Sequence, residues 1–231
     1  MNDKPANSRG SKAFKDFRYR LFYALLPHRR TKLITLHAPG SLCPWTICPD
    51  GIDSKSIVYS GGIGSDISFE HELGRQFGCD IVLYDPSPSG LKTMALPENK
   101  MDRFHYFPVA LAAHRGTLKM APPDPGDDCW FPRKDASATL EVPCVDLRSF
   151  MEQNGHTRID LLKMDIEGSE YEVIDDMLRR RIPVRQVCIE FHHGILPGYR
   201  RSQTIRSMLK LAARGYKLVC QEGSNHTFIL P

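Results

Sequence analysis

Residues 56–85 read SIVYSGGIGSDISFEHELGRQFGCDIVLYD. The apolar run at 56–60 predicts a strand, residues 68–77 a helix, and the apolar run at 80–84 a second strand. The glycine turn GGIGSD lies between the first strand and the helix. Because glycine lets the backbone approach a ligand and the start of a helix supplies free N–H groups, this unit predicts a site for the polar end of a nucleotide-like ligand.

Acidic residues at the ends of this unit narrow the choice of ligand. Asp85 ends the second strand, where a carboxylate can accept hydrogen bonds from ribose hydroxyls. A dinucleotide site would follow Gly62 and Gly64 with a third glycine, but Ile67 stands at that position. Asp66 would also repel a pyrophosphate and would favour a cationic ligand such as S-adenosylmethionine. A nicotinamide cofactor and a structural turn without a ligand stay open as alternatives.

Strands and helices continue to alternate beyond this unit. Continuous apolar runs separated by helices are typical of a parallel sheet covered on both faces. The pattern predicts strands at 103–111, 159–164 and 185–191, an extended piece at 117–120, helices at 91–96, 147–153, 171–180 and 204–214, and a closing antiparallel hairpin at 216–221 and 227–230. Ser169 and Glu172 have capping-box spacing at the start of helix 171–180.

Two segments stand apart from this alternation. Residues 1–32 form a leader with nine Lys or Arg and two Asp residues, so its formal charge is +7 and that of the remainder is −3. Within it, residues 12–26 predict a helix whose apolar positions are Phe14, Phe17, Leu21 and Leu25. That helix either packs on the body or makes a weak contact with a membrane surface or partner. Residues 39–54 are predicted as a connector, and residues 121–137, with four prolines, as an inserted loop that faces substrate or closes as a lid.

The composition of the chain excludes several broad classes. Its 231 residues, 41% hydrophobic and 25% charged, predict a globular chain rather than a disordered one. Seven cysteines without a C-x-x-C pair favour a reducing compartment, and the longest apolar run is far too short to span a membrane, so we expect a cytoplasmic protein. The acidic body argues against specific nucleic-acid binding.

A longer stretch, DLLKMDIEGSEYEVIDDML at residues 160–178, resembles the FkbM-type family of S-adenosylmethionine-dependent methyltransferases. VYSGGIGSDISFE (58–70), LYDPSP (83–88), VALAAHRGTL (109–118) and VCIEFHH (187–193) follow the family's order. The turn GGIGSD departs from the family's commoner D-x-G-A-x-x-G. The resemblance covers roughly residues 56–230, and a chain of 231 residues is expected to hold one domain, so we predict a single methyltransferase domain over residues 33–231. The resemblance implies an α/β fold, a Rossmann-like class I sheet of seven strands that is mostly parallel with one antiparallel strand and carries helices on both faces.

The resemblance also implies a cofactor site for S-adenosylmethionine. The residues expected there are Gly62 and Gly64 beside the methionine portion, Asp66 or Glu70 near its ammonium group, Asp85 on the ribose, and Ala110 and Leu111 around the adenine. The acceptor that it implies is a hydroxyl group of a small molecule, sugar or glycan.

A hydroxyl acceptor must lose a proton, which calls for a base or a bound cation near the methyl group. Asp165 and Glu167 follow the fourth strand, and Glu190, His192 and His193 end or follow the fifth, so their side chains are expected at one edge of the sheet. We predict Asp165, Glu190 and His192 as catalytic residues. The same three residues could hold Mg²⁺ or another divalent cation, or His192 could act as a base without a metal.

Each of these residues also has a purely structural interpretation. Asp165 could orient its loop, Glu190 could pair with an Arg or Lys, and Glu170 could favour the start of the following helix. Lys163, inside a strand, is as compatible with a structural role as with a catalytic one. A binding module that docks its basic leader on an anionic membrane or nucleic acid is the non-enzymatic alternative.

Overall fold

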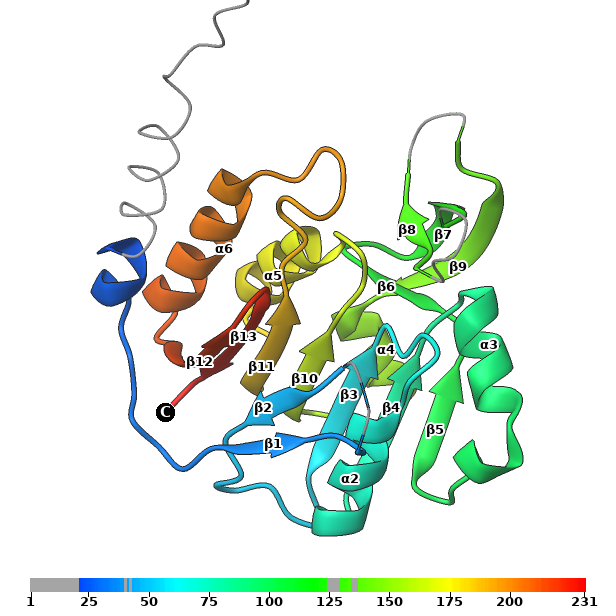
Figure 1. Cartoon of the computed structure of the whole chain (residues 1–231), viewed down its shortest axis with the longest axis horizontal. Coiled ribbons are helices and arrows are strands. Elements are labelled where there is room, and N and C mark those ends of the chain that lie inside the picture. Colours follow the sequence, from blue (N-terminus) through cyan, green and yellow to red (C-terminus); the bar gives the residue numbers. More distant parts are fainter. Residues whose placement is uncertain (1–20, 40, 42, 124–128, 134–136) are drawn as a thin grey trace, which may run out of the picture.

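The computed structural model describes residues 21–39, 41, 43–123, 129–133 and 137–231. Seven strands form its central sheet (Figure 1). In spatial order they are β12 (Lys217–Glu222), β13 (Asn225–Ile229), β11 (Val184–Glu190), β10 (Ile159–Met164), β3 (Ile57–Gly61), β4 (Asp80–Tyr84) and β5 (Phe104–Phe107). In this sheet β13 runs antiparallel to the other six strands, which share one direction. The predicted seven-stranded α/β fold with one antiparallel strand is confirmed.

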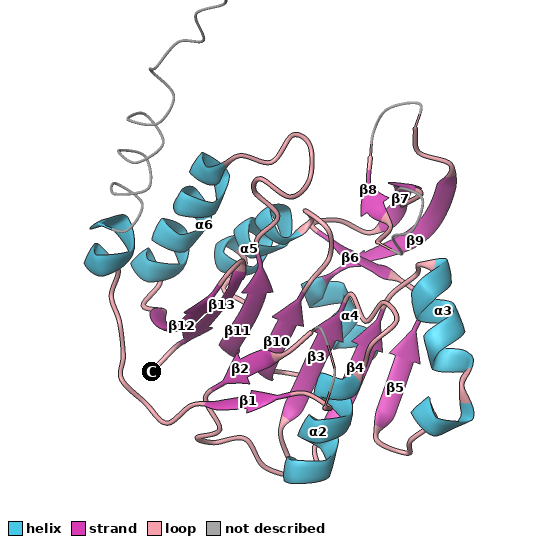
Figure 2. Ribbon diagram, viewed as in Figure 1, coloured by secondary structure: helices cyan, strands magenta, loops and turns pink. Residues whose placement is uncertain are grey.

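Helices cover both faces of this sheet (Figure 2). Side chains alternate along a strand, so in β10 Leu161 packs into one apolar cluster and Leu162 into the other. The first cluster contains residues of α2 (Ser68–Phe77) and α3 (Pro88–Ala95). The second contains residues of α4 (Leu147–Gln153), α5 (Glu170–Arg179) and α6 (Arg201–Ala213). Apolar strands that are buried on both faces explain why the sequence shows continuous apolar runs.

The register of the central strands brings three loop residues together. Gly61 of β3 pairs with Met164 of β10 on one side and with Tyr84 of β4 on the other. The residue after each strand therefore lies at the same level, which places Gly62 between Asp165 and Asp85. The carboxyl ends of parallel strands are where ligands bind in open α/β sheets.

A second sheet lies at the carboxyl ends of the parallel strands (Figure 1). Its strands, in spatial order, are β6 (Ala110–Ala112), β9 (Leu140–Asp146), β7 (Gly116–Ala121) and β8 (Phe131–Pro132). The single strand predicted at 103–111 is wrong, because the chain leaves β5 at Pro108, which has no N–H to donate to a ladder, and enters this sheet as β6. Part of the predicted loop 121–137 forms β8, which pairs with β7.

The predicted connector 39–54 also contains structure. Its residues Trp45–Ile47 form β2, which pairs antiparallel with β1 (Ile34–Leu36). This ribbon packs on the α2 face of the sheet, where the Trp45 and Phe69 ring centroids lie 6.4 Å apart. The Thr227 hydroxyl donates to the Thr46 carbonyl and ties the ribbon to β13. A three-residue strand is too short to show a period in the sequence.

The end of the leader that the structure describes packs on the core with a different face than the spacing of its apolar residues predicts. Residues 21–25 are helical, but Leu21 and Leu25 are exposed, Leu25 at 76%. Leu26, at 5%, enters the core instead, and Pro27 O accepts the Leu218 N–H at the edge of β12. The predicted positions Phe14 and Phe17 lie outside the described residues.

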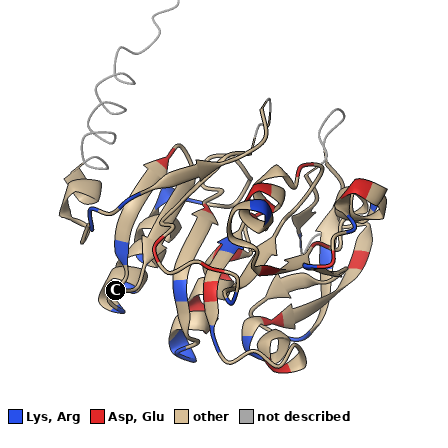
Figure 3. Cartoon of the chain, turned by 90° about the horizontal axis from the view of Figure 1, so that it is seen from below, with Lys and Arg blue, Asp and Glu red and all other residues tan. Residues whose placement is uncertain are grey.

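The other predicted elements keep their places with small shifts of boundary, and the helix predicted at 91–96 begins earlier, as α3. The capping box predicted at α5 is wrong, because the Ser169 side chain makes no cap hydrogen bond and the Glu170 carboxylate accepts the Ile166 N–H instead. Every helix in the described part of the chain is too short or too polar to span a membrane. Acidic and basic residues are interspersed along the ribbon (Figure 3).

Candidate active site

A cavity of about 150 Å³, partly open to solvent, lies at the carboxyl ends of β3, β4 and β10. Its walls are the glycine turn with the start of α2, the ends of β4 and β10, the start of β6, and residues of β7 and β8. Every residue predicted to bind a cofactor lines this cavity: Gly62, Gly64, Asp66, Glu70, Asp85, Ala110 and Leu111. The fold therefore gathers the whole predicted set at one place.

The two glycines of the turn have different roles. Gly62 has a φ of +69°, and a Cβ built on it would lie 1.4 Å from the Asp165 carbonyl oxygen. This position must be glycine because two backbone segments approach each other there. Gly64 has a φ of +49°, but nothing lies within 4 Å of its Cβ position. Gly64 thus leaves an open backbone surface toward the cavity.

Asp85, the predicted ribose ligand, is buried and holds the turn in place. Its Oδ2 accepts the Gly64 N–H at 2.9 Å, and its Oδ1 accepts the Ser87 N–H at 2.8 Å. A Cβ on Gly90 would lie 2.5 Å from Asp85 Cγ, so α3 also packs closely on this carboxylate. Each oxygen keeps a second lone pair, which leaves the carboxylate able to accept a ligand hydroxyl.

Asp66 and Glu70, the residues predicted near an ammonium group, are both held by hydrogen bonds. Asp66 accepts from the Ser41 hydroxyl at 2.6 Å and from the Ser68 N–H at 2.8 Å. Burial opposes its ionisation, but these hydrogen bonds outweigh burial and lower the pKa of Asp66. Glu70 is buried and accepts the Ser60 hydroxyl. Asp66 therefore carries its charge at neutral pH.

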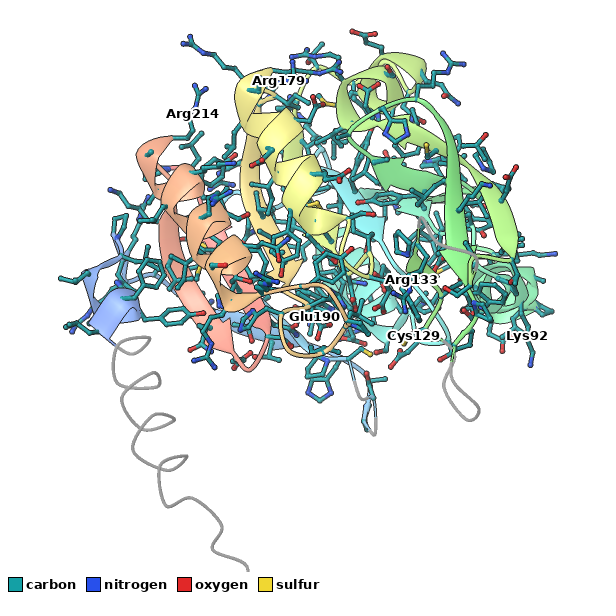
Figure 4. All side chains as sticks on the ribbon, turned by 90° about the horizontal axis from the view of Figure 1, so that it is seen from above. Lys92, Cys129, Arg133, Arg179, Glu190 and Arg214 are labelled. Carbon is teal, nitrogen blue, oxygen red and sulfur yellow. The ribbon has the colours of Figure 1, made fainter. Side chains whose placement is uncertain are left out.

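The three predicted catalytic residues come together after β10 and β11. Asp165, Glu190 and His192 each offer a ligand atom, and these atoms lie within 4.8 Å of one another. Glu190 accepts the Ser224 hydroxyl at 2.7 Å, and the described residues show no ion pair between it and an Arg or Lys. Only Asp165 of the three lines the cavity. In Figure 4, Glu190 lies on the same side of the molecule as Cys129 and Arg133, whereas Arg179 and Arg214 lie at the other.

Two further carboxylates surround the His192 ring. Nε2 lies 3.2 Å from Glu167 Oε2 and 3.6 Å from Asp165 Oδ1, and Nδ1 lies 3.1 Å from Glu170 Oε1. Burial disfavours the imidazolium, but Glu167 and Glu170 outweigh burial and raise the pKa of His192 to about 11. His192 is thus protonated at neutral pH in this arrangement, which argues against its predicted alternative role as a metal-free base. His193 lies elsewhere, with Nδ1 2.8 Å from the Thr204 hydroxyl.

The pKa of Asp165 is shifted in the opposite direction to that of Asp66. Burial raises its pKa well above the ordinary value, and the negative charges of Glu190 and Glu167 add to that effect, while Lys163 and His192 counteract it. A carboxyl group with a raised pKa is a stronger base when it is ionised. Asp165 also lies on the cavity wall, where a ligand in the cavity can reach its carboxyl group.

Several cavity residues were not among the predicted site residues. Cys43 enters from the β1–β2 connection, Trp45 from β2, and Cys129 from the β7–β8 hairpin, next to Trp130 of the loop predicted to face substrate. No motif marks them, because their place depends on how separate segments fold over the sheet. Lys163 did carry a signal, since a lysine inside a buried strand is unusual.

Residues 58–218 match the Methyltransferase FkbM domain family. The match covers well over half of the chain and includes the glycine turn, Asp85 and the Asp165 cluster. The chain belongs to the FkbM methyltransferase family. This membership confirms the resemblance drawn from residues 160–178 and favours a methyltransferase over the nicotinamide-dependent oxidoreductase.

Curated relatives of this FkbM chain are similar at a moderate level. It is 25% identical over 195 residues to the probable methyltransferase-like protein 24 of Homo sapiens, which covers 79% of this chain and 47% of that protein. The Rattus norvegicus protein of the same name is 25% identical over 191 residues, covering 78% and 47%. The chain thus spans about half the length of the curated relatives that it matches.

Solved structures resemble this FkbM domain only distantly. The Methanococcus jannaschii fibrillarin pre-rRNA processing protein gives a TM-score of 0.44 at 12% identity, covering 80% of this chain and 69% of that one. The METTL16 MTase domain gives 0.43 at 10% identity, covering 78% and 60%.

Proposed function

We propose that this chain is an S-adenosylmethionine-dependent O-methyltransferase that acts on a neutral hydroxyl group of a small molecule, sugar or glycan. The observation that carries the proposal is that one cavity contains both the whole predicted cofactor set and Asp165. A methyl donor held by the glycine turn and Asp85 would therefore lie in the same cavity as a potential proton acceptor.

The charges around the cavity support a cationic cofactor and a neutral acceptor. The described lining residues include five acids, namely Asp66, Glu70, Asp85, Asp165 and Glu167, but Lys163 is the only Lys or Arg among them. S-Adenosylmethionine carries a sulfonium and an ammonium group, which an acidic lining stabilises. A phosphorylated or carboxylated acceptor would be repelled by the same lining.

The proposed reaction is an in-line displacement. The acceptor oxygen forms a bond to the methyl carbon while the carbon–sulfur bond breaks, and its electron pair stays on sulfur as S-adenosylhomocysteine leaves. Asp165 takes the hydroxyl proton. Holding donor and acceptor in line contributes up to roughly 7–11 kcal/mol in favourable cases. His192, paired with Glu167 and next to Asp165, fixes the position of this carboxylate.

We also propose Asp165, Glu190 and His192 as the residues that would hold a divalent cation. Two carboxylates suit Mg²⁺ or Mn²⁺, and an imidazole suits Mn²⁺ and later transition metals. Such a cation supplies Lewis acidity, which lowers the pKa of a hydroxyl group. His192 would have to lose its proton to act as a ligand, so metal binding would release protons.

Calorimetric titration with S-adenosylmethionine and S-adenosylhomocysteine, with and without Mg²⁺, tests the proposal. The wild-type chain is expected to bind both, and Asp85→Asn and Asp85→Ala are expected to weaken binding at least tenfold. Asp80→Ala is the matched control, because Asp80 lies at the other end of β4 and its side chain is half-exposed. A folded wild-type chain that binds neither ligand would overturn the proposal.

Transfer of a labelled methyl group then tests the acceptor class. Neutral glycosides are expected to be methylated in preference to their phosphorylated or carboxylated counterparts. Asp165→Asn is expected to lower the rate at least a hundredfold while leaving cofactor affinity within threefold. Preferred methylation of the anionic acceptors would contradict the proposed acceptor class.

A further inference from the structure

Lys163 is a cation in the middle of the central sheet. Every residue of β10 is buried, and Lys163 itself is only 4% exposed. Its side chain lines the cavity, and Nζ donates to the Gly62 carbonyl at 2.7 Å. Burying an ammonium group is costly unless nearby groups compensate its charge and its N–H donors. Lys163 should therefore have partners for all of its donors.

The described part of the chain supplies only some of these partners. The ammonium group has three N–H donors, and the Gly62 carbonyl is the one hydrogen-bond acceptor that the described residues give it. Its Nζ lies 5.4 Å from the Trp45 ring centroid, which is a cation–π distance. No carboxylate of a described residue lies within 4.0 Å of Nζ, although Lys163 lowers the pKa of Asp66. Lys163 thus keeps donor capacity toward the cavity.

The position of this ammonium group matches one end of the proposed cofactor. The methionine portion of S-adenosylmethionine is expected at Gly62 and Gly64, and it carries an α-ammonium group and an α-carboxylate. Asp66, ionised and on the cavity wall, suits the ammonium group. Among acidic neighbours, a carboxylate needs a cation, and Lys163 is the cation at that wall.

We propose that Lys163 Nζ binds the α-carboxylate of S-adenosylmethionine and that Asp66 binds the adjoining α-ammonium group. The carboxylate would accept the remaining N–H donors of Lys163 and complete the compensation of its buried charge. This inference rests on the proposed function. The competing interpretation is that Lys163 only neutralises Asp66 and Asp165, in which case it does not distinguish ligands with and without a carboxylate.

Binding of two ligands by three proteins tests this pair. The ligands are S-adenosylmethionine and decarboxylated S-adenosylmethionine, which keeps the sulfonium and the amine but lacks the α-carboxylate. The proteins are the wild-type chain, Lys163→Met, and Lys92→Met as a control at an exposed lysine of α3 (Figure 4). We expect the wild-type chain and Lys92→Met to bind S-adenosylmethionine at least tenfold more tightly than the decarboxylated ligand. In Lys163→Met this preference should fall below threefold.

Each other outcome has a definite meaning. Equal weakening of both ligands in Lys163→Met, or an unchanged preference, would overturn the role of Lys163 while leaving the proposed function intact. If Lys163→Met does not fold, the wild-type comparison still decides, because equal affinity for the two ligands would contradict carboxylate recognition. A wild-type chain that binds neither S-adenosylmethionine nor S-adenosylhomocysteine would overturn the proposed function, and this inference with it.

Discussion

Gly62 and Gly64 have similar left-handed backbone conformations but different surroundings. A β-carbon at Gly62 would clash with the Asp165 carbonyl oxygen, whereas at Gly64 it would meet nothing within 4 Å. We predict that Gly62→Ala lowers the free energy of unfolding by about 3 kcal/mol or more, since clash and backbone strain add. Gly64→Ala should cost only about 1–2 kcal/mol, from backbone strain alone.

Urea unfolding of the two variants measures this difference. Gly64→Ala serves as the matched control, because it carries the same substitution in the same turn. Equal losses of stability in the two variants would contradict the assignment of Gly62 to the contact between β3 and β10.

Glu167 shows how much of the site depends on backbone conformation. Its φ of +53° lies in the left-handed region, which costs a residue with a side chain about 1–2 kcal/mol. This conformation accompanies the approach of its carboxylate to 3.2 Å from His192 Nε2. The sequence predicts that Glu167 follows a strand, but not that its backbone turns toward the imidazole.

At the scale of elements, the helix at residues 21–25 offers a direct comparison of neighbouring leucines. Leu26 lies in the core at 5% exposure, whereas Leu25 is 76% exposed. We predict that Leu26→Ala lowers the free energy of unfolding by about 2–4 kcal/mol, because it leaves a cavity against the sheet. Leu25→Ala should change it by less than about 0.5 kcal/mol.

Thermal and urea unfolding of the two variants test this assignment. A larger loss of stability in Leu25→Ala would show that the face predicted from the spacing of Leu21 and Leu25 is the one that packs. Loss of stability in Leu26→Ala alone would show that residues of the basic leader belong to the folded body.

The sequence predicted best those strands that have apolar neighbours on both faces of the sheet. Strands β3, β4 and β10 are buried on both faces, so each reads as one apolar run. Strand β9 was missed because Pro143, which has no N–H to donate to a ladder, stands in the middle of it. Partners in the second sheet, rather than local composition, determine that β9 is a strand.

At the scale of the whole molecule, His226 links stability to pH. It is 1% exposed, its Nδ1–H donates to the Ser224 carbonyl, and its Nε2 accepts the Tyr23 hydroxyl. Burial lowers its pKa to about 4, and the nearby His193 adds to this effect, although the hydrogen bond to Ser224 counteracts it. His226 is therefore neutral in the folded chain throughout the pH range in which an unfolded histidine becomes protonated.

The sign of the effect follows from proton linkage. Between about pH 6.5 and pH 4 the unfolded chain binds a proton at His226 that the folded chain does not, so stability falls as the pH falls. We predict a loss of about 2 kcal/mol from this residue between pH 7.5 and pH 5. Urea unfolding at both pH values measures it. His226→Gln is the control, because glutamine offers one donor group and one acceptor but does not titrate, and an equal loss in that variant would contradict the prediction.

The sequence was sufficient for the central sheet, the glycine turn and the list of polar residues at the strand ends. These features can be predicted from local properties of the sequence, namely its apolar runs, the conformational freedom of the turn glycines, and the family's motif in residues 160–178. Only the tertiary structure decided the features that depend on distant segments. These are the second sheet over the cavity, the carboxylates around His192, and the position of Lys163 among the acidic residues of the cavity wall. Charges interact through space rather than along the chain, so the ionisation of Asp165 and His192 follows from neighbours that no local pattern reveals.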